Sequence, residues 1–456
     1  MEWRSAWALV AVLATPGFSE SRTAMHDSNF SADEIRALRS YWSAPGRVQV
    51  QLLNENGREF SVRQTVEGSQ WLWNYNKARG LAKGDPGSPL SANSQRETVW
   101  TNWINARIEW DYAQAAVQAA QRNRQPAPAV RVPNPGPCPA DLVNLAGNPP
   151  AFAAPARPEQ HTLTFPDGMK LTYNTHVPMR KTFAYFRWPQ GVQSMGQRVK
   201  TLPERELQGL FQKAGLNKTE QNVFAAVSML EGGFDSVNTY DTGFVSVGLI
   251  QFATLKEGGH SLGQVMLRMK QEDPEEFRTH FRKFGLDVTD NGLLMAADLE
   301  SGATRIGPEA NQQIIEDKQL IAAFQRAGRI SEAFRVAQLK TAKAMYYPAD
   351  DVIRVDVNGT TMTGRVGDVF RTEAGLATLM DRKVNTGNLG RMNDLVGQTV
   401  REYDLASVKD AAQLEFLLIQ ALVFRKNYLL EASLSQPARP DVITSRSGTR
   451  RLRGPL

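Results

Sequence analysis

Apolar side chains recur every three or four positions between Thr219 and Leu230. At this spacing Val223, Phe224 and Val227 fall on one side of a helix, with polar residues on the other side. A stripe of this kind predicts an amphipathic helix that buries one face. We therefore expect this helix to pack against the core of a larger unit.

Glu231 is the residue that ends this stripe. It lies four positions after Val227, so it continues the buried face, and Gly232 and Gly233 follow as a helix stop. Partial burial and the negative end of the helix dipole both raise the pKa of a carboxyl group, which suits a general acid near neutral pH. A solvated or ion-paired glutamate is the alternative interpretation of this residue alone.

Two further acids follow in the segment from Phe234 to Phe252. Asp241 begins an Asp-Thr-Gly turn between two short runs of β-forming residues, which predicts a small hairpin. A helix that carries one carboxylate and a hairpin that holds another across a cleft would suit acid–base catalysis. Asp235 is the second choice for this role, and we expect it to be a turn residue.

The combination of Glu231 with the later Gly248-Leu249-Ile250-Gln251 resembles the signature of the lysozyme superfamily. It is similar to soluble lytic transglycosylases and goose-type lysozymes, which carry a catalytic Glu and then Gly-Leu-Met-Gln. The resemblance implies that Glu231 is the general acid and that Gln251 lies in the sugar-binding cleft. It also implies that Asp241 stands where goose-type enzymes place an acid. Isoleucine replaces the usual methionine, and Gly follows Glu231 in place of the Ser common in transglycosylases.

Three polar residues near Asp241 are candidates for substrate binding. Tyr240, Thr242 and Ser246 carry hydroxyl groups that can hydrogen-bond a sugar or orient a water molecule. Each is otherwise an ordinary turn or strand residue.

A second helix is predicted from Thr372, which can cap its start, to Gly387, which can end it. Asp381 and Asn385 are four positions apart and share a face of this helix. The pair is similar to the Asp-x-x-x-Asn-x-Gly helix of some phage-type muramidases and chitosanases. This likeness makes Asn385 a candidate substrate-binding residue, and the alternative is that the pair supports the fold.

The resemblance implies a peptidoglycan-cleaving glycosidase that cuts the bond between N-acetylmuramic acid and N-acetylglucosamine. The sequence contains no Ala-Tyr-Asn-Ala-Gly segment of the kind that transglycosylases carry, so muramidase and lytic transglycosylase both stay open. The alternative from another class is a non-catalytic lysozyme-like scaffold that binds the cell wall or takes part in its assembly.

The composition and net charge of the chain limit the classes of binding partner that we expect. The chain has 456 residues, 41% of them hydrophobic and 22% charged, which is typical of a globular protein with two or three domains. The net charge of +6 favours an anionic partner such as peptidoglycan with its acidic polymers, and it argues against chitosan, a polycation. Nucleic-acid binding would rest on a few arginines, and no nucleotide-binding motif is present.

Cofactor chemistry is not expected. Cys138 is the single cysteine, so an intramolecular disulfide and a cysteine-based metal cluster are excluded. The five histidines show no metal-ligand spacing. We expect no metal and no cofactor, as in a glycosidase driven by carboxylates.

The predicted domain order begins with residues 1–20, which resemble a secretory signal peptide and suggest a secreted or periplasmic protein of a bacterial or phage-like envelope. An ordinary amphipathic N-terminus is the alternative, and no run is long enough for a membrane span. The remaining predicted parts are a Trp-rich α+β domain (21–124), a Pro/Ala-rich linker (125–160), a lysozyme-like domain (161–435) and a basic disordered tail (436–456).

The tryptophans of the N-terminal domain have two interpretations. They can form its core, or they can stack on sugars in a glycan-binding module. The elements predicted there are a hairpin around Asn56-Gly57 and two helices.

Hairpins are also predicted around Asp167-Gly168 and Asn358-Gly359, and a closing helix at 409–434. The expected fold class is therefore mainly α with small β-hairpins, or α+β.

Overall fold

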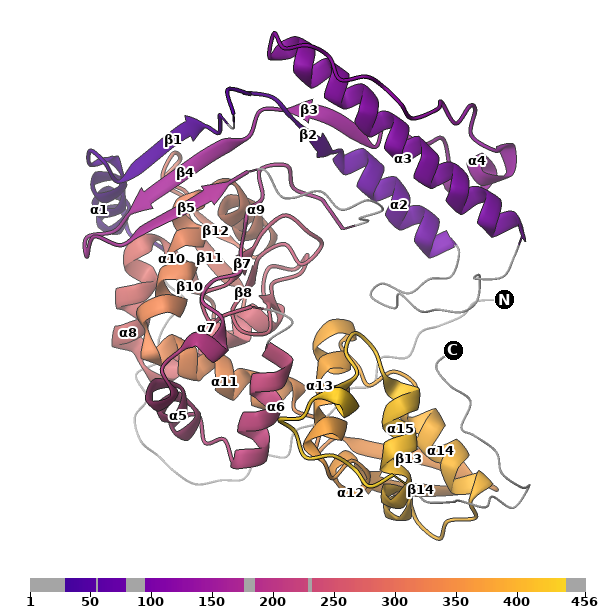
Figure 1. Cartoon of the computed structure of the whole chain (residues 1–456). Coiled ribbons are helices and arrows are strands. Elements are labelled where there is room, and N and C mark those ends of the chain that lie inside the picture. Colours follow the sequence, from indigo (N-terminus) through magenta and orange to yellow (C-terminus); the bar gives the residue numbers. More distant parts are fainter. Residues whose placement is uncertain (1–28, 55, 79–94, 176–184, 229–231, 440–456) are drawn as a thin grey trace, which may run out of the picture.

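A computed structural model describes residues 29–54, 56–78, 95–175, 185–228 and 232–439. The chain folds into three parts, which form an open C (Figure 1). We name them the central unit (29–54, 157–175, 185–228 and 232–346), the Trp-rich lobe (56–78 and 95–156) and the C-terminal unit (347–439). Glu231, the predicted signal peptide and residues 440–456 of the predicted tail lie outside the described residues.

A long antiparallel ribbon joins the central unit to the Trp-rich lobe. At one end β1 (Val48–Leu52), β4 (Glu159–Thr164) and β5 (Lys170–Asn174) form a sheet in the order β1-β4-β5. Further along, β2 (Ser61–Gln64) pairs with β3 (Ala153–Ala156). Helix α1 and the lobe lie at opposite ends of this ribbon (Figure 1).

This pairing differs from the hairpin predicted around Asn56-Gly57. Strand β1 pairs with β4, Val48 opposite Leu163, and not with its neighbour β2. An isolated two-stranded hairpin is marginally stable, whereas β1 completes a three-stranded sheet whose Leu163 is fully buried in the central core. The hairpin predicted around Asp167-Gly168 is present as β4 and β5.

The Trp-rich lobe consists of α2 (Val66–Ala78), α3 (Gln95–Arg122) and α4 (Ala140–Ala146), packed with β2 and β3. Trp71, Trp100 and Trp103 are buried in its core. The Trp71 indole donates a hydrogen bond to the carbonyl of Gly147 at 2.9 Å, and the Trp100 indole donates to Asp141 at 3.1 Å. These three tryptophans therefore hold the lobe together.

The predicted linker at 125–160 does not separate two domains. It contributes α4 and β3, and its side chains Leu142 and Phe152 are 0% and 1% exposed in the lobe core. Most of the prolines lie outside these two elements, and burial of the apolar side chains stabilises the lobe. The ribbon also assigns α1 and β1 to the central unit, so the predicted boundary at residue 124 does not match the structural units.

Besides the sheet β1-β4-β5 of the ribbon, the central unit is mainly helical and has two small sheets in the orders β6-β7-β8-β9 and β10-β11-β12. Its elements besides those of the ribbon are α1 (Ala32–Ser43), β6 (Gln193–Ser194), η1 (Val199–Thr201), α5 (Glu204–Lys213), α6 (Lys218–Ser228), β7 (Val237–Asn238), β8 (Ser246–Val247), β9 (Phe252–Ala253), α7 (His260–Glu272), α8 (Pro274–His280), η2 (Arg282–Phe284), β10 (Leu286–Val288), β11 (Leu294–Ala297), β12 (Thr304–Ile306), α9 (Pro308–Glu316), α10 (Lys318–Ile330) and α11 (Glu332–Tyr346).

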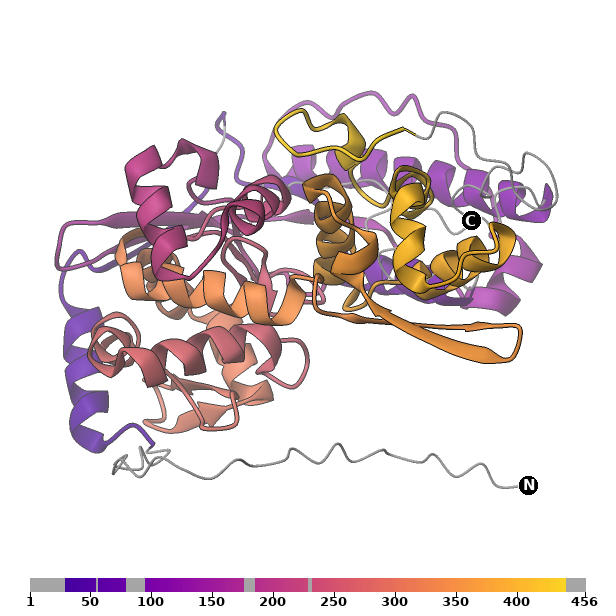
Figure 2. The same cartoon turned by 90° about the horizontal axis from the view of Figure 1, so that it is seen from below.

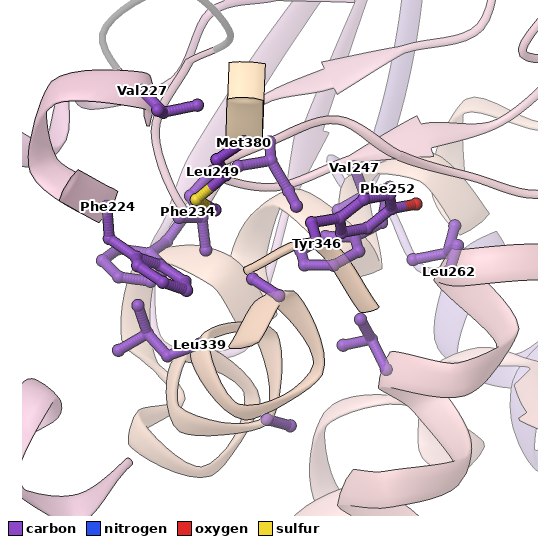
Figure 3. Packing of buried hydrophobic residues seen from close by; sticks show 14 of the residues in the cluster. Phe224, Val227, Phe234, Val247, Leu249, Phe252, Leu262, Leu339, Tyr346 and Met380 are labelled. Atoms are coloured by element: carbon purple, nitrogen blue, oxygen red, sulfur yellow. The ribbon is translucent and has the colours of Figure 1, made fainter. Parts of the chain in front are cut away.

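Helix α6 packs as its sequence pattern predicts. Val223, Phe224 and Val227 are at most 1% exposed. Figure 3 shows Phe224 and Val227 beside a cluster that includes Leu249 of the central unit and Met380 of the C-terminal unit. The central and C-terminal units thus share one continuous core, while the lobe has its own.

The C-terminal unit contains the hairpin of β13 (Val352–Val357) and β14 (Thr360–Arg365). Asn358 and Gly359 both have positive φ, as the predicted two-residue turn requires. Figure 2 shows this hairpin as the long orange pair of strands. The remaining elements are α12 (Val366–Val369), α13 (Glu373–Thr386), α14 (Met392–Glu402), η3 (Val408–Leu414), α15 (Glu415–Leu422) and η4 (Tyr428–Leu430).

The predicted closing helix at 409–434 is broken into η3, α15 and η4. The 3-10 turn η3 packs against α12 and α14, and Leu414 and Leu418 are both buried, so tertiary packing overrides the helical pattern. The fold class is mixed α and β with small sheets, as expected. In the described part of the chain, no helix has the length and apolar character needed to cross a membrane.

Candidate functional site

A cleft of about 680 Å³ lies between the central and C-terminal units. One wall is the hairpin of β7 and β8 with the segment up to Ser261, and the other is the end of α13. The described residues that line it are Tyr185, Asp241, Thr242, Gly243, Ser246, Ile250, Gln251, Ala253, Leu255, His260, Ser261, Met345, Tyr346, Lys383, Val384, Asn385, Thr386 and Gly387.

Asp241 stands at the turn of the β7–β8 hairpin, as predicted. Its Oδ1 accepts a hydrogen bond from the backbone N–H of Gly243 at 2.8 Å, and its Oδ2 accepts one from Asn238 Nδ2 at 2.9 Å. Both bonds come from neutral donors on the same hairpin. They fix the orientation of the half-buried carboxylate at the cleft.

The Gly248-Leu249-Ile250-Gln251 segment is folded tightly beneath the cleft. Gly248 has φ +90°, and a Cβ atom there would overlap the side-chain oxygen of Gln338. That oxygen accepts a hydrogen bond from the Leu249 N–H at 3.1 Å. Only glycine fits this position without strain.

Gln251 itself reaches the cleft with φ +54°. Its Nε2 donates to Ser236 Oγ at 2.7 Å and to the Gly248 carbonyl at 3.2 Å. The side chain is therefore held in a defined orientation at the cleft.

The three hydroxyl candidates have different positions. Thr242 and Ser246 line the cleft. Tyr240 is not among the described lining residues; its side chain is 6% exposed and packs with Phe186. Its neighbour Asp241, in the bend that follows β7, lines the cleft instead. The structure therefore does not support Tyr240 as a substrate-binding residue.

Helix α13 begins and ends where its sequence predicts, with Thr372 as N-cap and Gly387 at its end in the left-handed conformation. Asn385 lines the cleft, whereas Asp381 is 1% exposed. Both contact Arg425. Asp381 forms an ion pair with this guanidinium. The Asn385 amide accepts from Arg425 Nε at 2.9 Å when its oxygen is turned toward the guanidinium.

Burial raises the pKa of Asp381, and Arg425 opposes that shift. An acid of this kind, enclosed and paired with a cation, supports the fold. Asp235 is similar, since it is 2% exposed and its Oδ2 accepts from Arg329 Nε at 3.0 Å. Neither Asp381 nor Asp235 is among the described residues that line the cleft.

The lining residues that had no predicted role include Tyr185, His260, Tyr346 and Lys383. Lys383 Nζ is bound by both carboxylate oxygens of Asp351, at 2.6 and 2.9 Å. Lys383 shares the last turn of a predicted helix with Asn385, and this was a usable signal. Tyr185 carries no such signal, because a separate segment brings it to the cleft.

Glu231 lies outside the described residues, and its role stays a prediction. Its covalent neighbour Gly232 donates a backbone hydrogen bond to the Ser228 carbonyl at the end of α6, at 3.2 Å. A Cβ atom at Gly232 would lie 2.7 Å from Ser236 Oγ, the atom that binds Gln251.

The described residues contain no group of His, Cys, Asp or Glu side chains arranged to hold a metal ion. Comparison of the chain with protein-family models, with curated proteins and with solved structures finds no match.

Proposed function

We propose that this protein is a peptidoglycan-cleaving glycosidase of the lysozyme-like type. Glu231 is the general acid, and Asp241 acts from the hairpin wall of the cleft. One observation carries the proposal: Asp241, Gln251 and Asn385, singled out from separate parts of the sequence, line the same cleft. A volume of about 680 Å³ is within the usual range for a ligand site.

The charges in the cleft support a role for Glu231. Of the described residues that line it, Asp241 is the only carboxylate. Most glycosidases need two carboxyl groups, one to protonate the leaving oxygen and one to activate water or attack the sugar. Gly232 lies against Ser236, which binds Gln251 of the cleft. The proposal requires the Glu231 side chain, one residue earlier, to enter the cleft at Gln251.

In the proposed hydrolysis Glu231 donates its proton to the glycosidic oxygen as the bond from that oxygen to the muramoyl C1 breaks. Asp241 takes a proton from a water molecule, which adds to C1. A separation of roughly 6.5–9.5 Å between the two carboxyl groups leaves room for this water and predicts inversion at C1. In a lytic transglycosylase the muramoyl 6-hydroxyl attacks C1 instead, and an anhydro end results.

The test is mass spectrometry of purified peptidoglycan after incubation with the wild-type chain, Glu231→Gln and a control. Glu257 is an exposed glutamate that is not among the described lining residues, so Glu257→Gln is the matched control. We expect Glu231→Gln to lose about 10²–10⁴-fold in rate, the typical contribution of a positioned proton donor. Glu257→Gln should act like the wild type.

The products decide between the chemistries. Reducing muropeptide ends indicate a muramidase, and anhydro ends indicate a lytic transglycosylase in which Asp241 has a lesser role. A wild-type chain that binds peptidoglycan but releases no product would contradict the proposal and favour the non-catalytic wall-binding scaffold.

A further inference from the structure

Tyr185 is the aromatic residue that connects the cleft to the Trp-rich lobe. Its side chain lines the cleft together with Asp241. Its ring also packs against Trp73 of α2, with 5.4 Å between the ring centroids and an interplanar angle of 66°. Trp73 is half-buried, unlike the buried Trp71 two residues earlier.

The residues after Tyr185 are fixed between the lobe and the hairpin. Phe186 is buried against Tyr240, with Val66 of α2 packed beside them. The Arg187 backbone N–H donates to the Tyr240 carbonyl at 2.8 Å, and its guanidinium donates to Ser69 of α2 at 3.2 Å. The lobe therefore holds the segment that presents Tyr185.

The cleft lining carries charges of both signs, so attraction of a charged ligand does not explain binding there. Its described lining combines Asp241 with Lys383 and His260, and Lys383 is already paired with Asp351. Recognition of a largely neutral sugar must then use hydrogen bonds and apolar contact. The C–H faces of a pyranose ring pack well on an aromatic face, which carries partial negative charge.

We propose that Tyr185 is a sugar-stacking residue of the cleft and that Trp73 positions it. The ligand class is a strand of N-acetylated amino sugars, and this choice of ligand rests on the proposed function. The Trp-rich lobe then has a defined role. Trp71, Trp100 and Trp103 form its core, while Trp73 sets the orientation of the binding residue Tyr185.

The test is calorimetric binding of an N-acetylglucosamine hexamer to full-length variants in a Glu231→Gln background, which prevents turnover. We expect Tyr185→Ala to weaken binding about tenfold, the equivalent of one aromatic contact of roughly 1.4 kcal/mol. Tyr185→Phe keeps the ring and should bind within about twofold of the parent, a difference of less than ~0.5 kcal/mol. Trp73→Ala should weaken binding less than Tyr185→Ala, and Trp73→Phe should restore it.

Tyr403, a half-buried tyrosine outside the described cleft lining, provides the matched control through Tyr403→Ala. Equal binding by Tyr185→Ala and the parent would overturn the inference, and so would a parent that does not bind the hexamer. If the hexamer affinity depends on Tyr185 but the wild-type chain releases no product from peptidoglycan, the proposed function is contradicted and the proposed sugar subsite is supported.

Discussion

The two walls of the cleft hold their acids in different ways. On the hairpin wall, Asp241 is half-buried and accepts hydrogen bonds from a backbone N–H and an asparagine amide. On the helix wall, Asp381 is fully enclosed and paired with Arg425. Arg187 also interacts electrostatically with Asp241, but that carboxylate stays half-buried at the cleft, whereas Arg425 offsets the charge of a carboxylate that is enclosed in the interior. We therefore propose that the chemistry takes place at the hairpin wall and that the helix wall supports the fold.

The largest expected effect is a loss of peptidoglycan-cleaving activity when Asp241 on the hairpin wall is changed. If Asp241 is the base of an inverting hydrolase, Asp241→Asn should lower the rate of peptidoglycan cleavage by about 10²–10⁴-fold, because the amide cannot accept a proton. The unfolding free energy should fall by about 1 kcal/mol, because Asn238 Nδ2 loses its acceptor. Release of reducing ends and urea unfolding measure the two quantities.

Asp290→Asn is the control for that variant, since Asp290 is exposed and is not among the described cleft residues. Full activity of Asp241→Asn would remove this residue from the mechanism. It would leave the transglycosylase chemistry, in which the substrate supplies the nucleophile.

The next effect is on stability at the helix wall. Asp381→Ala leaves the Arg425 guanidinium without its carboxylate partner, and breaking a buried ion pair from one side costs about 3 kcal/mol. We expect the urea midpoint to fall accordingly, with a residual activity at low temperature that follows the folded fraction. A stable but inactive Asp381→Ala would contradict the comparison and give Asp381 a chemical role.

The smallest effect is expected at a partly exposed ion pair outside the cleft. A hydrogen bond from Arg282 lowers the pKa of Glu34 from 4.5 to about 2. The folded pKa is depressed, so the pair stabilises the fold above pH ~4.5, and this contribution is lost as the pH falls toward 2. Because solvent screens the pair, Glu34→Gln should cost at most about 1 kcal/mol at pH 7.

This difference between Glu34→Gln and the wild type should disappear in unfolding experiments near pH 2. A difference that persists there would mean that packing of α1, and not the charge of Glu34, is responsible.

Local patterns predicted the elements that carry the site. The stripe of Val223 and Val227 determined the buried face of α6, and Thr372 and Gly387 determined the ends of α13. Asn358-Gly359 specified its hairpin because both residues adopt positive φ at little cost. These features depend on neighbours in sequence, so a single chain is enough to predict them.

Pairings between distant segments were decided by the tertiary structure. Strand β1 joined β4, more than a hundred residues later, and not the nearby β2, because a three-stranded sheet over the central core buries more than a local hairpin. The predicted linker became part of the lobe because Leu142 and Phe152 fill its core. Hydrophobic burial is not directional, and the sequence does not show which of many surfaces an apolar residue will cover.

The same distinction between local sequence pattern and tertiary packing applies to the candidate site. The sequence by itself singled out the candidate residues: Asp241 in a turn, the glycine at 248 and Asn385 on its helix face. Only the tertiary structure decided that they line one cleft. It also decided that Tyr240 is buried against Phe186 and that Asp381 forms an ion pair with Arg425. Residue type and local spacing fix what a side chain can do, whereas the packing of distant elements fixes what it meets.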